Sequence, residues 1–206
     1  MDTKRSSYAI FYAAALGLVC ALALTAIDRA TEERKAANAQ AEEVRNILTV
    51  LGVPFDAEAA AAGLLSTYEA NVSEEERGDV SFFVYNNPEA GRLAATRFDG
   101  PGLWGPIEGF LCLEEDMTTI YAISFYRHEE TPGLGGEISA DWFQDQFRGK
   151  SIDDGAGIPG IHVVGDGATG SNEVDAISGA TMTGDKVEEM LNSLIEELAG
   201  GSGANG

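Results

Sequence analysis

The feature of this sequence that most constrains its fold is an uncharged apolar run close to the N-terminus. Residues 8–27 read YAIFYAAALGLVCALALTAI and contain no charged side chain. A helix of this length is about 30 Å long, which matches the hydrocarbon core of a membrane. Residues 1–29 are therefore predicted to form a single membrane-spanning anchor, and membrane lipid is the first partner that the sequence implies.

The charges that flank the run predict its orientation. Lys4 and Arg5 precede it, which favours a cytoplasmic N-terminus, although three basic residues at 29, 34 and 35 weaken the contrast. The rest of the chain is then expected on the extracytoplasmic side of a bacterial inner membrane. Two alternatives stay open. Residues 21–23 form a small-x-small site at which a signal peptide could be cleaved, and Cys20 could carry a lipid.

Composition narrows the partners and cofactors. The chain has 34 acidic and 13 basic side chains and a net charge of −21, so it repels phosphate backbones and nucleic acid is not an expected partner. Cys20 lies in the apolar run and Cys112 lies far outside it, so membrane and water would keep them apart and no disulfide is predicted. Without a Cys/His cluster, a structural zinc or iron–sulfur site is not expected.

Hydrophobic periodicity predicts one α+β domain beyond the anchor. Residues 30–78 are expected to be a helical linker and covering region: a helix over 31–51 with an apolar stripe, then residues 56–78 as helix and acidic loop. Strands are predicted at 80–85, 93–98, 107–113 and 119–127, the last two as an antiparallel hairpin. A short helix at 140–147, with Trp142, Phe143 and Phe147 on its apolar side, a strand at 161–164 and a helix capped by Thr183 complete the domain, residues 79–199. Residues 200–206 are expected to be a flexible tail.

The glycine run at residues 165–170 matches the G-x-G-x-x-G pattern of dinucleotide-binding sites. That site needs a helix that opens at the glycines, so that a pyrophosphate meets its N-terminus. Here the polar sequence SNEVD follows, and the next predicted helix begins about a dozen residues later. These glycines are interpreted as turn residues.

The segment DAISGATMT, residues 175–183, is the strongest candidate for a ligand site. Small residues directly before a helix let the backbone approach a phosphate, and the free N–H groups of the helix face the anion. Hydroxyls at Ser178, Thr181 and Thr183 add hydrogen-bonding groups. On these grounds alone the segment is either a phosphate site or a polar turn that caps a helix.

The same residues resemble the flavinylation motif of the FMN-binding-domain family. The residues that carry this resemblance are Ser178, Gly179, Ala180 and Thr181, preceded by Asp175. In that family a flavin transferase moves FMN from FAD onto the last threonine and makes a phosphoester. The resemblance implies that Thr181 carries covalent FMN, and that Asp175, Ser178, Gly179, Ala180 and Thr183 line the phosphate or are recognised by the transferase.

A second stretch, EETPGLGGE at residues 129–137, resembles the family's loop beside the flavin ring. By that resemblance Glu130, Thr131, Gly133, Leu134 and Gly135 border the cofactor. Similarity in order and spacing adds Trp104, in GLWG at 102–105, and Lys150, which follows Trp142 and Gly149. Without the resemblance, the glycine-containing loop is a turn after a strand.

The resemblance implies an electron-transfer subunit of a membrane redox complex. The family includes subunits of the Na⁺-translocating NADH:quinone reductase, the first expectation, and of the Rnf complex, the alternative. Anchored flavoproteins that feed extracellular reductases, and a cofactor-free anchored interaction domain, also stay open. No nucleophile with a base is visible, and His128 and His162 are interpreted as structural or surface residues, so the cofactor would do the redox chemistry. The apolar run has no ionisable group, so ion movement is expected in partner subunits. The acidic surroundings are expected to lower the flavin potential.

Overall fold

The computed structural model describes residues 3–56, 58–153, 160–165 and 167–201. They divide into two compact units, Met1–Glu42 and Glu43–Gly206, and each unit is described by itself. Helix α1, Thr3–Val50, contributes its last turns to the second unit. Most of the predicted flexible tail, residues 202–206, lies outside the described residues, while Gly200 and Gly201 still belong to helix α4.

The first unit is helical and contains the predicted anchor. The segment Tyr8–Glu32, 25 residues long, is long and apolar enough to cross a membrane, and its apolar side chains are exposed. The hydroxyls of Thr25 and Thr31 donate to the carbonyl oxygens of Ala21 and Ile27 at 2.8 and 2.9 Å. Because these hydroxyls are satisfied within the helix, they do not oppose burial in lipid.

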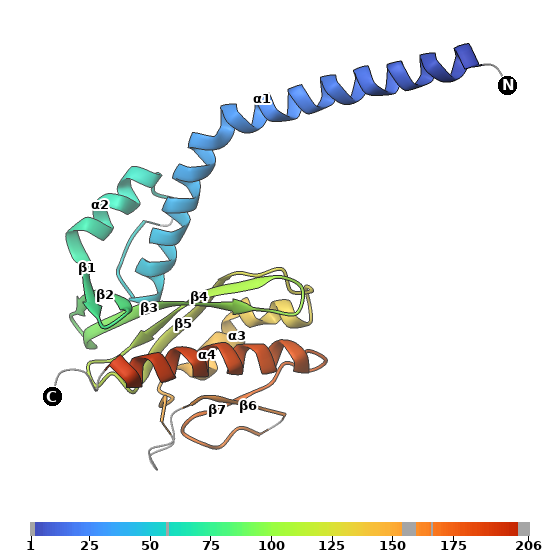
Figure 1. Cartoon of the computed structure of the whole chain (residues 1–206). Helices are drawn as coiled ribbons and strands as arrows, with labels where there is room; N and C mark the ends of the chain where they lie inside the picture. Colours follow the sequence, from blue (N-terminus) through green and yellow to red (C-terminus); the bar gives the residue numbers. More distant parts are fainter. Residues whose placement is uncertain (1–2, 57, 154–159, 166, 202–206) are drawn as a thin grey trace. The chain divides into compact units, whose positions relative to one another are not determined.

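The second unit is built on a five-stranded antiparallel sheet in the order β1-β2-β3-β4-β5, in which every strand pairs with its neighbour in sequence (Figure 1). The α+β class and the hairpin between the last two strands are confirmed. The strands are β1 Ser73–Arg77, β2 Val80–Asn87, β3 Gly91–Pro101, β4 Pro106–Leu113 and β5 Ile120–Arg127.

Helices cover both faces of this sheet. Helix α4, Thr181–Gly201, lies along one face together with the short helices η1 Gly135–Ser139, α3 Asp141–Gln144 and η2 Asp145–Phe147 (Figure 1). The last turns of α1 lie on the other side of the sheet, where Glu43 approaches Arg97 of β3 at 3.6 Å. Helix α2, Ala61–Asn71, lies on that side as well. Successive residues of a strand point to opposite faces of the sheet, and here both faces are covered. This explains why β3 is buried at four consecutive positions from Leu93 to Thr96.

Four expectations about local structure were wrong. The acidic residues 73–77, expected as loop, form strand β1, because an edge strand needs only one hydrogen-bonded neighbour and tolerates exposed charges on both faces. Strand β7, Glu173–Asp175, was not predicted and pairs in parallel with β6, His162–Val164. Trp142 is 49% exposed, whereas Phe143 and Phe147 are buried as predicted. Helix α4 begins at Thr181, so Thr183 is in its first turn and is not its N-cap.

Asp116 fixes the β4–β5 turn. Its Oδ1 accepts hydrogen bonds from the backbone N–H groups of Thr118 and Thr119 at 2.9 and 2.8 Å, and its Oδ2 accepts one from the Thr119 hydroxyl at 2.6 Å. Burial raises the pKa of the Asp116 carboxyl, but these hydrogen bonds together outweigh it and leave the pKa below the ordinary 3.8.

Replacing Asp116 by alanine is expected to lower the stability of the domain by about 1 kcal/mol at pH 7. Because the folded-state pKa is lowered, the advantage of the native chain is fully present above pH ~4 and shrinks as pH falls through the folded-state pKa. Thermal unfolding of both chains between pH 7 and 3 measures this. A difference that grows on acidification would contradict the assignment.

Gly109 of β4 is required for the packing of the sheet. A Cβ at this position would lie 2.2 Å from Cζ of Phe98 and 2.3 Å from the carbonyl oxygen of Ser124. The Phe98 ring lies over the backbone of Gly109, and neither it nor the backbone carbonyl can move without disturbing the core.

We expect Gly109→Ala to destabilise the domain by about 3 kcal/mol, measured as a lower midpoint of thermal unfolding of the detergent-solubilised chain. Gly165→Ala is the matched control, because a Cβ there meets no atom within 4 Å and the backbone φ is not positive. The control should change stability by less than about 0.5 kcal/mol. Equal effects of the two substitutions would show that the Phe98 contact is not the cause.

Candidate cofactor site

A tight turn leads directly into helix α4. The N–H of Ala180 donates to the carbonyl oxygen of Ile177 at 3.0 Å, and Gly179 has φ +76°, as expected for the third residue of a type II turn. The carbonyl of Ala180 then accepts the first hydrogen bond of the helix, from the N–H of Gly184 at 3.0 Å. The glycine therefore allows the chain to reverse just before the helix begins.

Thr181 is the first residue of α4 and its side chain is exposed. Within the described part of the chain, its hydroxyl has no hydrogen-bond partner. The backbone N–H groups at the start of a helix have no partner inside the helix, and they carry the positive end of the helix dipole. The Thr181 hydroxyl is thus accessible to a reagent and lies where a phosphoryl group would be stabilised.

The Glu130 carboxylate joins three separate segments next to this helix start. Its Oε1 accepts hydrogen bonds from the backbone N–H groups of Leu103 and Trp104 at 2.7 and 3.3 Å. Its Oε2 accepts a hydrogen bond from the Thr183 hydroxyl at 2.7 Å. We call these four residues the Glu130 network. The network brings the 102–105 loop and the first turn of α4 to one place, although they are almost eighty positions apart in sequence.

The predicted 129–137 loop also borders the helix start. The N–H groups of Leu134 and Gly136 donate to the carbonyl oxygen of Thr131 at 3.1 and 2.9 Å, which closes the loop on itself. A Cβ on Gly179 would lie 3.2 Å from Cδ2 of Leu134, so the two segments are in contact. Gly133 has φ +76° and open space around its Cα, so the tip of the loop is both accessible and specific for glycine.

Large apolar side chains are exposed on these segments. Leu103, Trp104, Leu134 and Met182 are 42, 67, 44 and 62% exposed, whereas apolar side chains of this size are normally buried. Neighbouring exposed apolar groups mark a surface that binds a partner or an apolar ligand. Leu103 and Met182 were not predicted as site residues; their positions inside GLWG and SGATMT were the available signal.

The remaining predicted residues lie around these segments or further away. Ser178 and Thr131 are exposed, and Ala180 is buried at the turn. Asp175 supports the approach to the turn: its Oδ1 accepts a hydrogen bond from the N–H of Ala168 at 2.7 Å. Lys150 is not brought to the Glu130 network, because its ammonium donates to the carbonyl oxygen of Gly170 at 3.0 Å.

The histidines have structural contacts. Nδ1 of His128 accepts a hydrogen bond from the N–H of Glu130 at 3.3 Å and so supports the backbone of the network. His162 is exposed and lies 3.3 Å from the Glu188 carboxylate. Among the residues that the structure describes, no group of His, Cys, Asp or Glu side chains is arranged to hold a metal ion.

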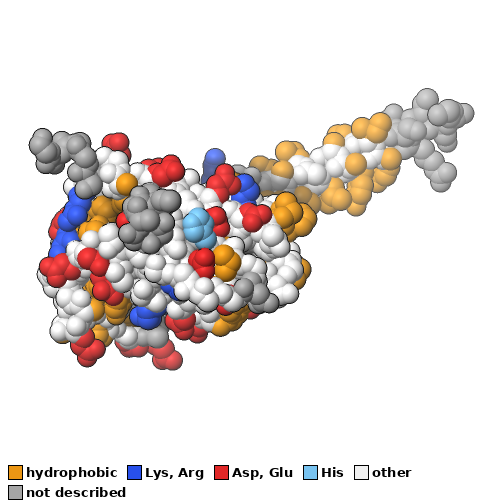
Figure 2. Space-filling model, turned by 90° about the horizontal axis from the view of Figure 1, so that it is seen from below, with side chains coloured by type: hydrophobic (Ala, Val, Ile, Leu, Met, Phe, Trp, Pro, Cys, Tyr) orange, Lys and Arg blue, Asp and Glu red, His pale blue; other side chains and the backbone are white. Residues whose placement is uncertain are grey.

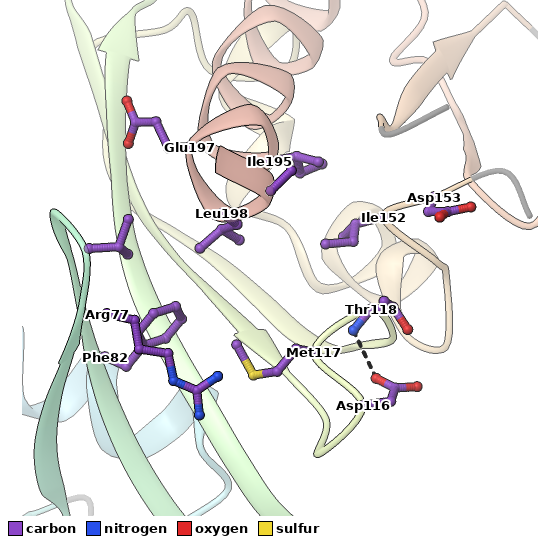
Figure 3. Close-up of a pocket in the computed structure, with 12 residues that line it drawn as sticks. Arg77, Phe82, Asp116, Met117, Thr118, Ile152, Asp153, Ile195, Glu197 and Leu198 are labelled. Carbon is purple, nitrogen blue, oxygen red and sulfur yellow. Dashed lines mark hydrogen bonds between the residues drawn. The ribbon is translucent and has the colours of Figure 1, made fainter. Parts of the chain in front are cut away.

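A cavity of the domain lies elsewhere (Figure 3). It has a volume of about 330 Å³ and is lined by Phe82, Met117, Ile152, Ile195 and Leu198, among others. Ile195 is fourteen positions after Thr181 on the same helix, a distance of about 21 Å along its axis. The cavity is therefore separate from the site at the helix start.

The two ends of α4 thus have different surroundings. At the Thr181 end, an exposed hydroxyl lies beside backbone N–H groups without intrahelical partners and beside exposed apolar side chains. This combination fits a phosphate ester attached to a flat apolar group. On the face shown in Figure 2, acidic side chains outnumber basic ones. The whole chain has 34 acidic and 13 basic side chains. A free polyanion would be repelled by this surface, whereas a covalent bond retains the ligand whatever the surrounding charge.

Known proteins resemble this chain over the segments that form the candidate site. Residues 102–196 match the family model described as "FMN-binding domain", which confirms the expected resemblance. The match includes every site segment described above.

The chain is similar to the NqrC subunit of Na⁺-translocating NADH-quinone reductases. It is 38% identical to the protein of Chlamydia trachomatis over 126 residues, and 45% identical to that of Neisseria meningitidis serogroup A over 91 residues. These matches cover 53 and 43% of this chain, and 40 and 35% of the relatives. The chain thus spans about two-fifths of the length of these curated relatives.

Solved structures agree with the fold. The corresponding subunit of Parabacteroides distasonis is 26% identical, with a TM-score of 0.71, over 85% of this chain and 98% of that one. NqrC of Shewanella oneidensis, at 20% identity and a TM-score of 0.65 over 75% of this chain and 91% of that one, shares the fold.

Proposed function

We propose that this chain is a membrane-anchored electron-transfer subunit that carries FMN as a phosphoester on Thr181. One observation carries the proposal: the exposed Thr181 is the first residue of α4, next to helix amides without intrahelical partners and to a loop with exposed apolar side chains. The matching domain model and the similarity to NqrC support the choice of FMN.

Attachment requires a flavin transferase and FAD. In that reaction the Thr181 oxygen forms a bond to the phosphorus of the FMN half of FAD. The bond between this phosphorus and the oxygen that bridges the two phosphates breaks, AMP leaves and the hydroxyl proton is released. The helix amides at the start of α4 are placed to stabilise the negative charge of the resulting diester. Because the hydroxyl is exposed, a separate enzyme can reach it.

The bound FMN would supply reversible electron transfer, and the protein would supply position and electrostatics. Leu103, Trp104, Leu134 and Met182 provide apolar surface against which a flat ring can be held away from water. The many carboxylates disfavour added negative charge and so favour a lower flavin potential. This chain would relay electrons between neighbouring redox centres without binding NADH or quinone itself.

We propose the Na⁺-translocating NADH:quinone reductase as the complex, because the relatives described above are its NqrC subunit. Tyr8–Glu32 would anchor the chain in the membrane as a single span, with the domain on the extracytoplasmic side. Other subunits of the complex are then the partners, and ion movement resides in them. Co-purification decides between this complex, the Rnf complex and a free-standing flavoprotein.

Mass spectrometry tests the covalent site directly. The full chain is produced in membranes together with a flavin transferase and digested, and the peptide that spans residues 175–186 is measured. We expect the added mass of FMN, less water, on this peptide. An unmodified peptide from a preparation in which a known substrate of the transferase is loaded would reject the proposal, and would favour a cofactor-free interaction domain.

A further inference from the structure

The Glu130 carboxylate is buried without a cationic partner. The residue is only 5% exposed, and none of the ion pairs among the described residues involves it. A buried carboxylate is costly unless its oxygens accept hydrogen bonds. Here both oxygens do so, with two backbone N–H groups on one and a hydroxyl on the other. The three donors therefore determine where this side chain lies.

The protein backbone is shaped around this carboxylate. A Cβ on Gly102 would lie 2.6 Å from Oε1 of Glu130, and a Cβ on Gly135 would lie 2.6 Å from its Oε2. A side chain at either position would crowd the carboxylate. Close approach to Glu130 is thus one of the contacts that require glycine here, together with the carbonyl oxygen of Gly105, which would lie 2.7 Å from a Cβ on Gly102.

The three bonded groups belong to the segments that form the candidate site. Leu103 and Trp104 are two of its exposed apolar residues, and Thr183 is the third residue of α4, two positions after Thr181. A carboxylate beside the first turn of a helix is also stabilised by the helix dipole. The residues bonded to the two oxygens of Glu130 thus belong to the surface that the cofactor would touch, or lie next to it.

We infer that Glu130 is a positioning residue for covalent flavin attachment. Because it bonds Leu103, Trp104 and Thr183 at once, it holds residues 102–105, the Trp104 loop, against the start of α4. It thereby fixes the surroundings in which the Thr181 hydroxyl reacts. The inference rests on the proposed function. Glu130 does not touch the reacting oxygen and acts through the two segments that it joins.

Three substitutions of Glu130 distinguish its positioning of the two segments from the effect of its charge. In Glu130→Gln, the amide oxygen can accept the N–H groups of Leu103 and Trp104, and the amide N–H can donate to the Thr183 hydroxyl, so the segments stay joined without the charge. In Glu130→Asp the charge remains, but the side chain is one methylene too short to reach all three donors. Glu130→Ala removes every bond of the network.

The experiment measures the rate of flavin attachment to the full chain in membranes, with transferase and FAD, at a temperature where each variant is folded. We expect Glu130→Gln to react within about twofold of the native chain, and Glu130→Asp and Glu130→Ala to react about tenfold more slowly, because small displacements at a reacting group have large effects on rate. Glu89→Ala removes an exposed carboxylate in the turn between β2 and β3, outside the candidate site, and should react at the native rate.

A second readout needs no flavin. In a Trp142→Phe background, Trp104 is the remaining tryptophan, and its fluorescence anisotropy reports the mobility of the 102–105 loop. The anisotropy should fall in Glu130→Ala and Glu130→Asp, and stay at the native value in Glu130→Gln. Gly109→Ala controls for lost stability, because it weakens the core at a position outside the network and should change neither the anisotropy nor the attachment rate.

Three results would overturn the inference: native attachment rates in Glu130→Ala, slowing by Gly109→Ala as large as that by Glu130→Ala, or a glutamine variant as slow as the alanine variant. If the native chain takes up no flavin, the proposed function fails instead, and the anisotropy of Trp104 still shows whether Glu130 holds the loop. A native chain that is loaded normally, together with any of the three results, removes only the role of Glu130.

Discussion

We expect Thr181→Ala to abolish covalent attachment of flavin, because the substitution removes the oxygen that would form the phosphoester and leaves no hydroxyl at the first position of α4. The loss should be complete within detection. The measurement is ultraviolet fluorescence of the protein band on a denaturing gel, which retains only covalently bound flavin. The side chain at residue 181 is exposed, so the substitution should leave thermal stability within about 0.5 kcal/mol of the native value.

Two controls make this result specific. Ser178→Ala removes another exposed hydroxyl three residues earlier, in the segment that the transferase would recognise, and should weaken the fluorescent band without abolishing it. Thr181→Ser keeps the oxygen and should keep measurable attachment. A fluorescent band of native intensity in Thr181→Ala would place the flavin on a different residue. A band lost equally in Ser178→Ala would show that recognition of the segment, and not the Thr181 oxygen alone, determines the signal.

Gly135→Ala should both destabilise the domain and slow the attachment of flavin. A Cβ at this position would lie 2.4 Å from Oγ1 of Thr183 and 2.6 Å from Oε2 of Glu130, which are hydrogen-bonded to each other. The methyl group therefore separates the two, and leaves a buried carboxylate oxygen without its donor. We expect a loss of about 3 kcal/mol in the free energy of unfolding, and attachment slowed by more than about tenfold.

Gly133→Ala is the matched control in the same loop. Its φ of +76° makes alanine unfavourable by about 1 kcal/mol, but a Cβ there meets no atom within 4 Å. The difference between the two variants isolates the contact with the Glu130 network from the backbone effect. Thermal unfolding and gel fluorescence measure both properties. If the two variants lose the same stability and the same flavin, loop conformation alone explains the result and the network does not.

Local patterns predicted the elements with strong periodicity. The apolar run, four of the strands in the five-stranded sheet, the β4–β5 hairpin and the last helix follow directly from side-chain patterns that report which face is buried. Strands β1 and β7 were not predicted, because their own side chains show no strand pattern. The charged residues of β1 gain their backbone partners from β2, and the three residues of β7 gain theirs from β6.

The start of the last helix illustrates the same limit. The sequence favoured Thr183 as an N-cap, because threonine often accepts a hydrogen bond there. In the structure its hydroxyl instead donates to Glu130, a residue fifty-three positions away, and the helix begins two residues earlier at Thr181. Lys150 shows the converse: order and spacing placed it with the site, whereas its ammonium bonds Gly170.

The sequence by itself determined the apolar anchor segment, the α+β class and the identity of the segments that form the candidate site, because hydrophobic period, turn residues and short motifs are local properties. Only the tertiary structure decided that Glu130 joins the Trp104 loop to Thr183, and that Leu103 and Met182 are exposed beside them. These contacts depend on how β3, β4 and α4 pack, and no local pattern records the distance between residues that are far apart along the chain.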